Sequence, residues 1–308
     1  MAKLPDLKVK INDDTQIFHG SWWRGDTVNF IPSKVNLRET NAVEKYVLPG
    51  WCPDEPFITK SKKIVAFGSC FAANISKYLS EKGYAVMGEE LELDAHIIRF
   101  GEGMVNTFAI LQQLDWAINK KEMPENIWFG AGKEIAAVDP SIRDQTSEII
   151  NNTDVFILTL GLSEIWYDKR NNEPLWRAVP AQLFDKKIHG FRVSSFQENF
   201  ENLSSIRSLI REVKPHAPII FTLSPIPLIA TFRPISCITA NSASKAILRA
   251  ALDQLMREYD KDSNLFYFPS YEIITDFHPD PYIEDNRHPR GDLIHGIMEL
   301  FEKYFCLP

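Results

Sequence analysis

Short apolar runs that end at a glycine, proline or serine alternate along most of the chain with longer segments of helical spacing. The apolar runs predict buried strands at residues 63–67, 154–161, 218–223 and 265–268. The segments of helical spacing predict helices at residues 72–82, 106–119, 196–213, 241–259 and 293–305. Strands that alternate with helices indicate βαβ units, so we expect an α/β fold, a three-layer α/β/α sandwich with a mostly parallel sheet.

The first 60 residues follow a different pattern, with many turn-forming and aromatic residues among charged ones. Such a segment does not easily form a core of its own. We therefore expect an N-terminal extension at residues 1–60 that packs on a main domain at residues 61–308. Its aromatic residues would pin it there; they include Trp22, Trp23 and Trp51.

Composition is that of an ordinary globular protein. Of 308 residues, 44% are apolar and 24% are charged. The net charge of −7 argues against a general nucleic-acid binder, which would show a basic face. The start of the chain lacks the apolar core of a secretory signal, and no apolar run reaches the length of about 18 residues that spans a membrane. We expect a cytoplasmic protein without a membrane span; the oligomeric state stays open.

Cysteine and histidine spacing gives no sign of a metal or cofactor. The four cysteines lie far apart and none forms a C-x-x-C pair. The seven histidines are scattered, and there is no P-loop or G-x-G-x-x-G motif. We expect reduced thiols, no metal and no cofactor.

Polar residues follow the first predicted strand, where ligands of parallel sheets bind. Gly68 permits a tight turn, and Ser69 and Cys70 then lie at a helix N-terminus. The N-terminus can lower a thiol pKa and offers N–H groups to an oxyanion. In the alternative interpretation Ser69 is a helix cap and Cys70 a small buried hydrophobe.

Two further groups of residues could complete such a site. Gly161, Ser163 and Glu164 follow the second strand, although Ser163 could equally cap a helix. Asp285 and His288, three residues apart, could lie side by side, with the imidazole as a base and the carboxylate orienting it. The alternative is an aspartate that caps a turn beside a solvated histidine.

These motifs resemble those of two related groups of proteins. Residues 64–70, 161–164 and 285–288 resemble the G-D-S opening, the G-x-N-D turn and the D-x-x-H motif of SGNH (GDSL-type) hydrolases. The closer resemblance, over residues 46–296, is to the GSCFA family, whose opening motif is found letter for letter at residues 68–72. The resemblance implies a flavodoxin-type three-layer fold and a catalytic main domain.

The sequence departs from the SGNH pattern at two positions. Cys70 takes the place of the nucleophilic serine, and Ser69 that of the aspartate before it. Ser163 stands where the superfamily has its oxyanion asparagine. Losing such a donor costs on the order of a hundredfold in rate. Asn106, which follows Gly103, could replace it.

We therefore expect an esterase or O-acyltransferase. Cys70 would be the nucleophile, Ser69 its competitor, His288 the base and Asp285 its orienting partner. The backbone N–H of Cys70 would hold the oxyanion; Gly103, Asn106 and Ser163 would help it. The substrate would be an ester of a small molecule or glycan; the acyl group, the acceptor and the pathway stay open.

Two other interpretations remain at this point. A non-catalytic carbohydrate-binding protein on a decayed hydrolase scaffold would explain the two departures. Alternatively, Cys70 is a redox-sensing thiol, which Cys237 could approach in space.

Overall fold

The computed structural model describes residues 7–11, 14–18, 29–88, 94–99, 103–123, 129–130, 133–134 and 139–308. The chain divides into two compact units, Met1–Gly50 and Trp51–Pro308. Residues 51–60, which the sequence pattern assigns to the extension, are thus part of the second unit. Trp22 and Trp23 lie outside the described residues.

The first unit contains a hairpin and a short helical segment. Strands β1 (Leu7–Ile11) and β2 (Asp14–Phe18) are antiparallel. The turn η1 (Asn36–Arg38) precedes helix α1 (Ala42–Tyr46). Between them, Glu39 accepts hydrogen bonds from Lys45 Nζ at 2.8 Å and the Tyr46 hydroxyl at 3.0 Å. Chiefly through the Lys45 hydrogen bond, these contacts lower the pKa of Glu39 to about 2.

The second unit is built on a parallel sheet. Its described strands pair in the order β3 (Ile64–Phe67), β6 (Val155–Leu160), β9 (Ile219–Leu223) and β10 (Leu265–Phe268). All pairings are parallel, as the sequence predicts. Every residue of β6 and β9 is buried, so these two strands form the centre of the core.

The strand order places a switch point between β3 and β6. Val86 forms a parallel bridge with Ile64, so it extends the sheet on the side of β3 away from β6. Across the sheet the order is therefore the Val86 segment, β3, β6, β9 and β10. Numbered by their place along the chain, these are 2-1-3-4-5, the doubly wound order of flavodoxin-type sheets. Such sheets bind ligands beyond the carboxyl ends of the two strands at the switch point.

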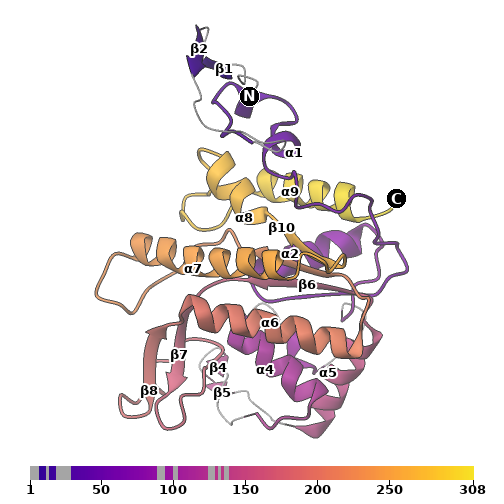
Figure 1. Ribbon diagram of the computed structural model, residues 1–308. Coiled ribbons are helices and arrows are strands. Elements are labelled where there is room, and N and C mark those ends of the chain that lie inside the picture. The colour runs from indigo at the N-terminus through magenta and orange to yellow at the C-terminus, as the bar shows by residue number, and fades with distance from the viewer. Residues whose placement is uncertain are drawn as a thin grey trace. The chain divides into compact units, whose positions relative to one another are not determined.

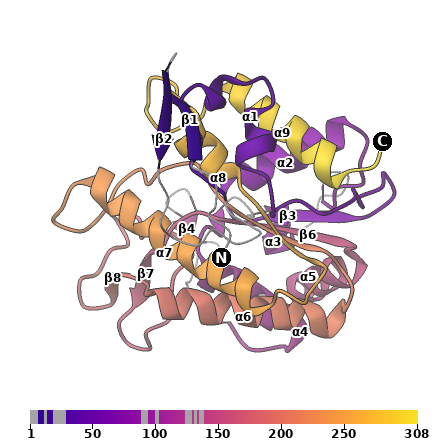
Figure 2. The same ribbon diagram turned by 45° about the horizontal axis from the view of Figure 1, so that its top comes forward.

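Helices cover both faces of the sheet. Figures 1 and 2 show α2 and α9 on one face and α4 and α6 on the other; α7 packs against α6. The result is the predicted three-layer α/β/α arrangement. The bounds are α2 (Cys70–Glu81), α4 (Thr107–Ile118), α6 (Phe196–Val213), α7 (Cys237–Glu258) and α9 (Gly291–Phe305). No described helix combines the length and the apolar character needed to cross a membrane.

Several elements are absent from the sequence-based prediction. The hairpin β7 (Glu164–Asp168) and β8 (His189–Val193) follows β6, so the alternative in which Ser163 begins a helix is wrong. Helix α5 (Pro140–Asn152) has Asp139 as its cap. The short elements are α3 (His96–Arg99), β4 (Phe129–Gly130), β5 (Lys133–Glu134), α8 (Ser270–Glu272) and η3 (Ile273–Phe277).

Residues 51–60 pack on the C-terminal part of the sheet. The Trp51 ring meets the Tyr267 ring edge-on, with centroids 5.2 Å apart. Phe57 stacks on Phe266 at 5.1 Å. Trp51 therefore serves packing.

Candidate functional site

The turn after β3 presents Cys70 to solvent and keeps Ser69 inside. Gly68 has φ +131°, and a Cβ atom there would overlap the carbonyl oxygen of Thr159, so only glycine fits. Ser69 is 4% exposed, and its Oγ accepts a hydrogen bond from the Phe71 N–H at 3.2 Å. Cys70, the first residue of α2, is exposed. The cap role of Ser69 is thus confirmed, whereas the interpretation of Cys70 as a buried hydrophobe is wrong.

Two neighbouring cavities open beside Cys70. Their volumes are about 270 Å³ and 50 Å³. Both are lined by Cys70 and Arg287, together with Val105, Leu162 and Leu228. We call the larger one the main cavity and the smaller one the inner cavity. Of the predicted residues, Gly103, Asn106 and Glu164 line the main cavity, and Ser69 and Gly161 line the inner one.

Asn106 is held with its amide group ready to donate. It caps α4, and its Oδ1 accepts a hydrogen bond from the Ala109 N–H at 2.9 Å. Because the oxygen is bound to the helix, the Nδ2 group is the end that can donate to a ligand in the main cavity. The preceding residue, Val105, accepts hydrogen bonds from the N–H groups of Gly161 and Leu162 at 2.7 and 3.2 Å. These bonds tie the start of α4 to the turn after β6.

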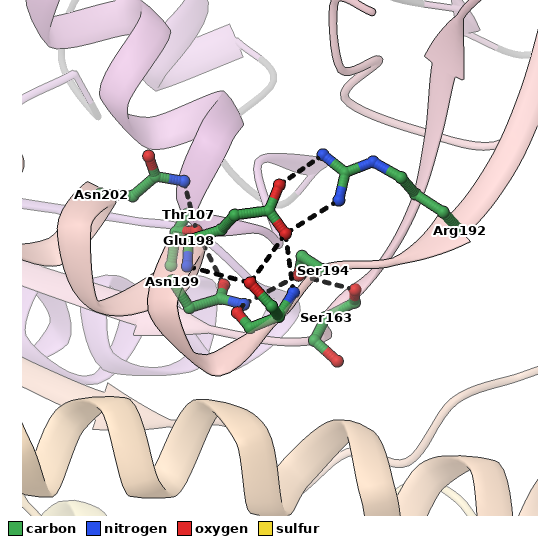
Figure 3. A network of polar contacts seen from close by, with 8 residues as sticks. Thr107, Ser163, Arg192, Ser194, Glu198, Asn199 and Asn202 are labelled. Carbon is green, nitrogen blue, oxygen red and sulfur yellow. Dashed lines mark hydrogen bonds and ion pairs between the residues drawn. The ribbon is translucent and has the colours of Figure 1, made fainter.

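Ser163 lies in a buried polar network. Its N–H donates to Ser244 Oγ at 2.8 Å, and its carbonyl accepts from the Ser194 hydroxyl at 2.8 Å. Asn199 Nδ2 donates to Ser194 Oγ at 2.8 Å, and Thr107 Oγ1 donates to Asn199 Oδ1 at 2.9 Å. Figure 3 shows the contacts from Ser163 through Ser194 and Asn199 to Thr107, which join the turn after β6 to α6 and α4. Ser163 is outside both sets of lining residues as the described part of the chain defines them.

Asp285 and His288 form a hydrogen-bonded pair. His288 Nδ1 contacts Asp285 Oδ2, while Oδ1 accepts from the N–H groups of Arg287 and His288, both at 2.9 Å. Asn286 adopts a left-handed conformation with φ 53°, which asparagine tolerates and which turns the chain back toward Asp285. These hydrogen bonds, that of the imidazole above all, lower the pKa of Asp285 to about 2.

The pairing with Asp285 determines which nitrogen of the neutral imidazole carries its hydrogen. An ionised Asp285 accepts from Nδ1–H, so neutral His288 has its lone pair on Nε2. Asp285 also caps its turn and His288 is exposed, as in the alternative interpretation from sequence. The two interpretations are therefore compatible with each other.

Arg287 links the Asp285–His288 turn to both cavities. Its NH1 lies 3.4 Å from His288 Nε2, and its Nε donates to the Pro227 carbonyl at 3.2 Å. The same segment is held to the loop after β9 by the Tyr282 hydroxyl, which donates to the Pro225 carbonyl at 2.9 Å. The turn that carries His288 is thus anchored to the loop after β9, while Asp285 and His288 are outside both sets of lining residues as the described residues define them.

A fully buried lysine lies beneath the site. Lys245 Nζ donates to the carbonyl oxygens of Gly161 at 2.6 Å and Ser224 at 2.8 Å, directly after β6 and β9. Both of these residues line the inner cavity. Burial, with a smaller contribution from the charge of Arg287, lowers the pKa of Lys245 to about 7.

Glu164 is a buried carboxylate in the wall of the main cavity. Its Oε2 accepts a hydrogen bond from Thr231 Oγ1 at 2.7 Å, and its Oε1 lies 3.5 Å from Arg233 NH1. The arginine balances the negative charge. Within the described residues, no cluster of histidine, cysteine or carboxylate groups could hold a metal ion.

The fold and site define an α/β protein whose candidate chemistry lies at the switch point of a parallel sheet. The GSCFA family model matches residues 63–301. Because this match covers most of the chain, the protein belongs to the GSCFA family. The match begins at residue 63, so it does not include residues 46–59, which also resemble the family in sequence. A comparison with curated proteins gives no match.

Two residues of the site, Arg287 and Lys245, cannot be predicted from the sequence. Arg287 lies within the D-x-x-H motif, but nothing in the spacing shows that its side chain lines the cavities. Lys245 sits in a predicted helix that ends with many charged residues, where a lysine is expected on the solvent face. The one local hint is Ser244, directly before the lysine and three positions after Asn241, because Ser244 and Lys245 both reach the turn after β6.

Proposed function

We propose that this protein is a cysteine-dependent esterase or O-acyltransferase. One observation carries the proposal: Cys70 is exposed at the start of α2, on cavity walls shared with Arg287, whose neighbour His288 is paired with Asp285. The resemblance of these motifs to SGNH hydrolases supports the same chemistry.

The reaction has two halves. His288 Nε2 takes the proton of the Cys70 thiol, and the sulfur attacks the ester carbonyl carbon. The tetrahedral intermediate collapses as its C–O bond breaks, and the leaving alkoxide takes the proton from the imidazolium. The resulting thioester is then attacked by water or an acceptor hydroxyl, which gives its proton to His288. The C–S bond breaks, and the leaving thiolate takes the proton back from the imidazolium of His288.

The geometry of the site supports a set of oxyanion donors. The backbone N–H of Cys70 lies at the helix N-terminus, and Gly103 and Asn106 line the same cavity. Asn106 Nδ2 would then supply the side-chain donor that SGNH enzymes take from the turn after the middle strand. The N–H of Ser163 is bound to Ser244, so we leave Ser163 out of the oxyanion hole.

Ser69 is the weaker candidate for the nucleophile. Its hydroxyl oxygen accepts a helix-capping hydrogen bond and its side chain is buried. Moving it to a substrate would cost the cap, about 1 kcal/mol, and disturb the turn.

The test compares Cys70→Ala, Cys70→Ser and Ser69→Ala on an aryl acetate, with intact-protein mass spectrometry of the acyl adduct. We expect the adduct on Cys70, its loss in Cys70→Ala, and its loss or strong slowing in His288→Ala. Full activity in Cys70→Ala with loss in Ser69→Ala would reassign the nucleophile. A folded protein that forms no adduct with any acyl donor would refute the enzyme proposal and favour a binding protein on this scaffold.

A further inference from the structure

We propose that the main cavity takes a medium-length apolar acyl chain, so that the substrate is a fatty-acyl ester or thioester. This inference rests on the proposed function, because it assigns the acyl side of the same reaction. It follows from the walls of the main cavity, its mouth and its size.

The walls of the main cavity are apolar beyond the reacting end. Trp166 of β7 forms the centre of an aromatic cluster, with its ring centroid 5.4 Å from Phe191 and 4.7 Å from Phe232. Apolar residues from four segments complete the wall: Val105, Leu162, Ile165, Leu175, Trp176, Leu228 and Ile229. A glycan ring in such surroundings would leave several hydroxyls without partners, at a cost of roughly 1–3 kcal/mol each.

The main cavity has polar side chains at the proposed reacting end and two charged side chains elsewhere in its wall. Cys70, Asn106 and Arg287 line the main cavity, and Cys70 and Arg287 also line the inner one. Of the two other charged side chains in the wall, Arg177 is exposed, and the buried Glu164 is bound by Thr231 and paired with Arg233. This distribution suits a ligand with one polar end and an apolar tail.

The exposed residues that line the main cavity include two large apolar side chains as well as Arg177. Ile229 is 81% exposed and Phe232 is 56% exposed, and both line the cavity. Large exposed apolar side chains at the rim of a ligand site mark apolar recognition. A chain longer than the cavity could continue across them.

The volume sets the length of the chain. A space of about 270 Å³ holds roughly nine groups of the size of a methylene or a water molecule, each occupying about 30 Å³. We therefore expect a preference for acyl chains of roughly eight to ten carbons over acetyl.

The experiment measures acylation of Cys70 by p-nitrophenyl esters of two to twelve carbons, with the adduct identified by intact mass. Each buried methylene contributes about 0.8 kcal/mol, so the acylation rate constant kcat/KM should rise roughly fourfold per methylene until the cavity is full. Ala230→Trp, which places a large ring in the wall, should lower the ratio of octanoyl to acetyl rates at least tenfold. Ile238→Ala is the matched control: Ile238 is 77% exposed and outside the lining residues, so the ratio should stay unchanged.

The outcomes separate the two proposals. A Cys70 adduct that forms equally fast with acetyl and octanoyl esters overturns the acyl-chain inference and leaves the proposed enzyme intact. An unchanged chain-length ratio in folded Ala230→Trp places the chain elsewhere and also overturns it. No adduct with any ester refutes the enzyme itself, and the chain inference with it.

Discussion

Replacement of Lys245 by methionine should remove a pH dependence from the stability of the fold. The ammonium group is fully buried and donates to the carbonyls of Gly161 and Ser224. Burial and Arg287 lower its pKa to about 7. In the unfolded chain the group returns to about 10.4. Between these two values the unfolded state binds more protons than the folded state, so the free energy of unfolding rises with pH.

The size of the effect follows from the two pKa values. The change amounts to about 1.4 kcal/mol per pH unit where the folded group is neutral and the unfolded group is charged. Allowing for half-titration at pH 7, stability should rise by about 2 kcal/mol between pH 7 and pH 9 through Lys245 alone. Below pH 7 both states are protonated, and the dependence levels off.

Urea unfolding at pH 7, 8 and 9 measures the effect. Methionine also leaves two carbonyls without donors. This lowers the free energy of unfolding by the same amount at every pH and does not change its slope against pH. Other groups act in the opposite direction at the upper end: burial raises the pKa of Tyr84 and of Cys306, each to about 12. These contributions are the same in wild type and Lys245→Met, so they cancel in the difference between the two free energies of unfolding. Lys77→Met, at an exposed position of α2, is the control. Equal slopes in wild type and Lys245→Met would refute the buried-lysine reasoning.

Three further changes test the site and its frame. Gly68→Ala should lower the free energy of unfolding in urea by about 2–4 kcal/mol, because its Cβ overlaps the Thr159 carbonyl at a positive φ; wild-type stability would contradict this. Asp285→Asn should slow acylation by on the order of a thousandfold with little change in stability, since His288 loses its orienting partner; an unchanged rate would remove Asp285 from the mechanism. Asn199→Leu should cost about 2–4 kcal/mol in urea unfolding by leaving buried hydroxyls unpaired, and a neutral effect would show that the polar network tolerates its loss.

The central layer of the fold can be predicted from the sequence because its strands are short and almost wholly apolar, with Thr159 and Thr222 as the exceptions in β6 and β9. Residues 219–223 and 265–268 fall within the predicted strands, and α6 begins and ends where the pattern indicates. Helix α7 begins one turn earlier than predicted, at Cys237. The hairpin of β7 and β8 was not predicted, because Glu164–Asp168 mixes acidic and aromatic residues and its partner strand lies some twenty residues further on.

The candidate site was predictable where a motif carries a local role. Ser69 and Cys70 follow from the turn that Gly68 permits, and the pairing of Asp285 with His288 follows from their spacing. Ser163 could not be placed, because its surroundings depend on Ser244, 81 residues away in the chain. The burial of Lys245 could not be predicted for the same reason. It depends on the ends of β6 and β9 meeting at its ammonium group, and no local sequence pattern indicates that they do.

The apolar wall of the main cavity has a consequence for how members of the family can differ. Ile165, Trp166 and Phe191 come from the β7–β8 hairpin, a separate excursion of the chain after β6. The thiol and the imidazole belong to other segments. On the proposed function, a chimera that exchanges residues 164–193 between two family members should therefore change acyl-chain selectivity while leaving Cys70 and His288 of the recipient in place.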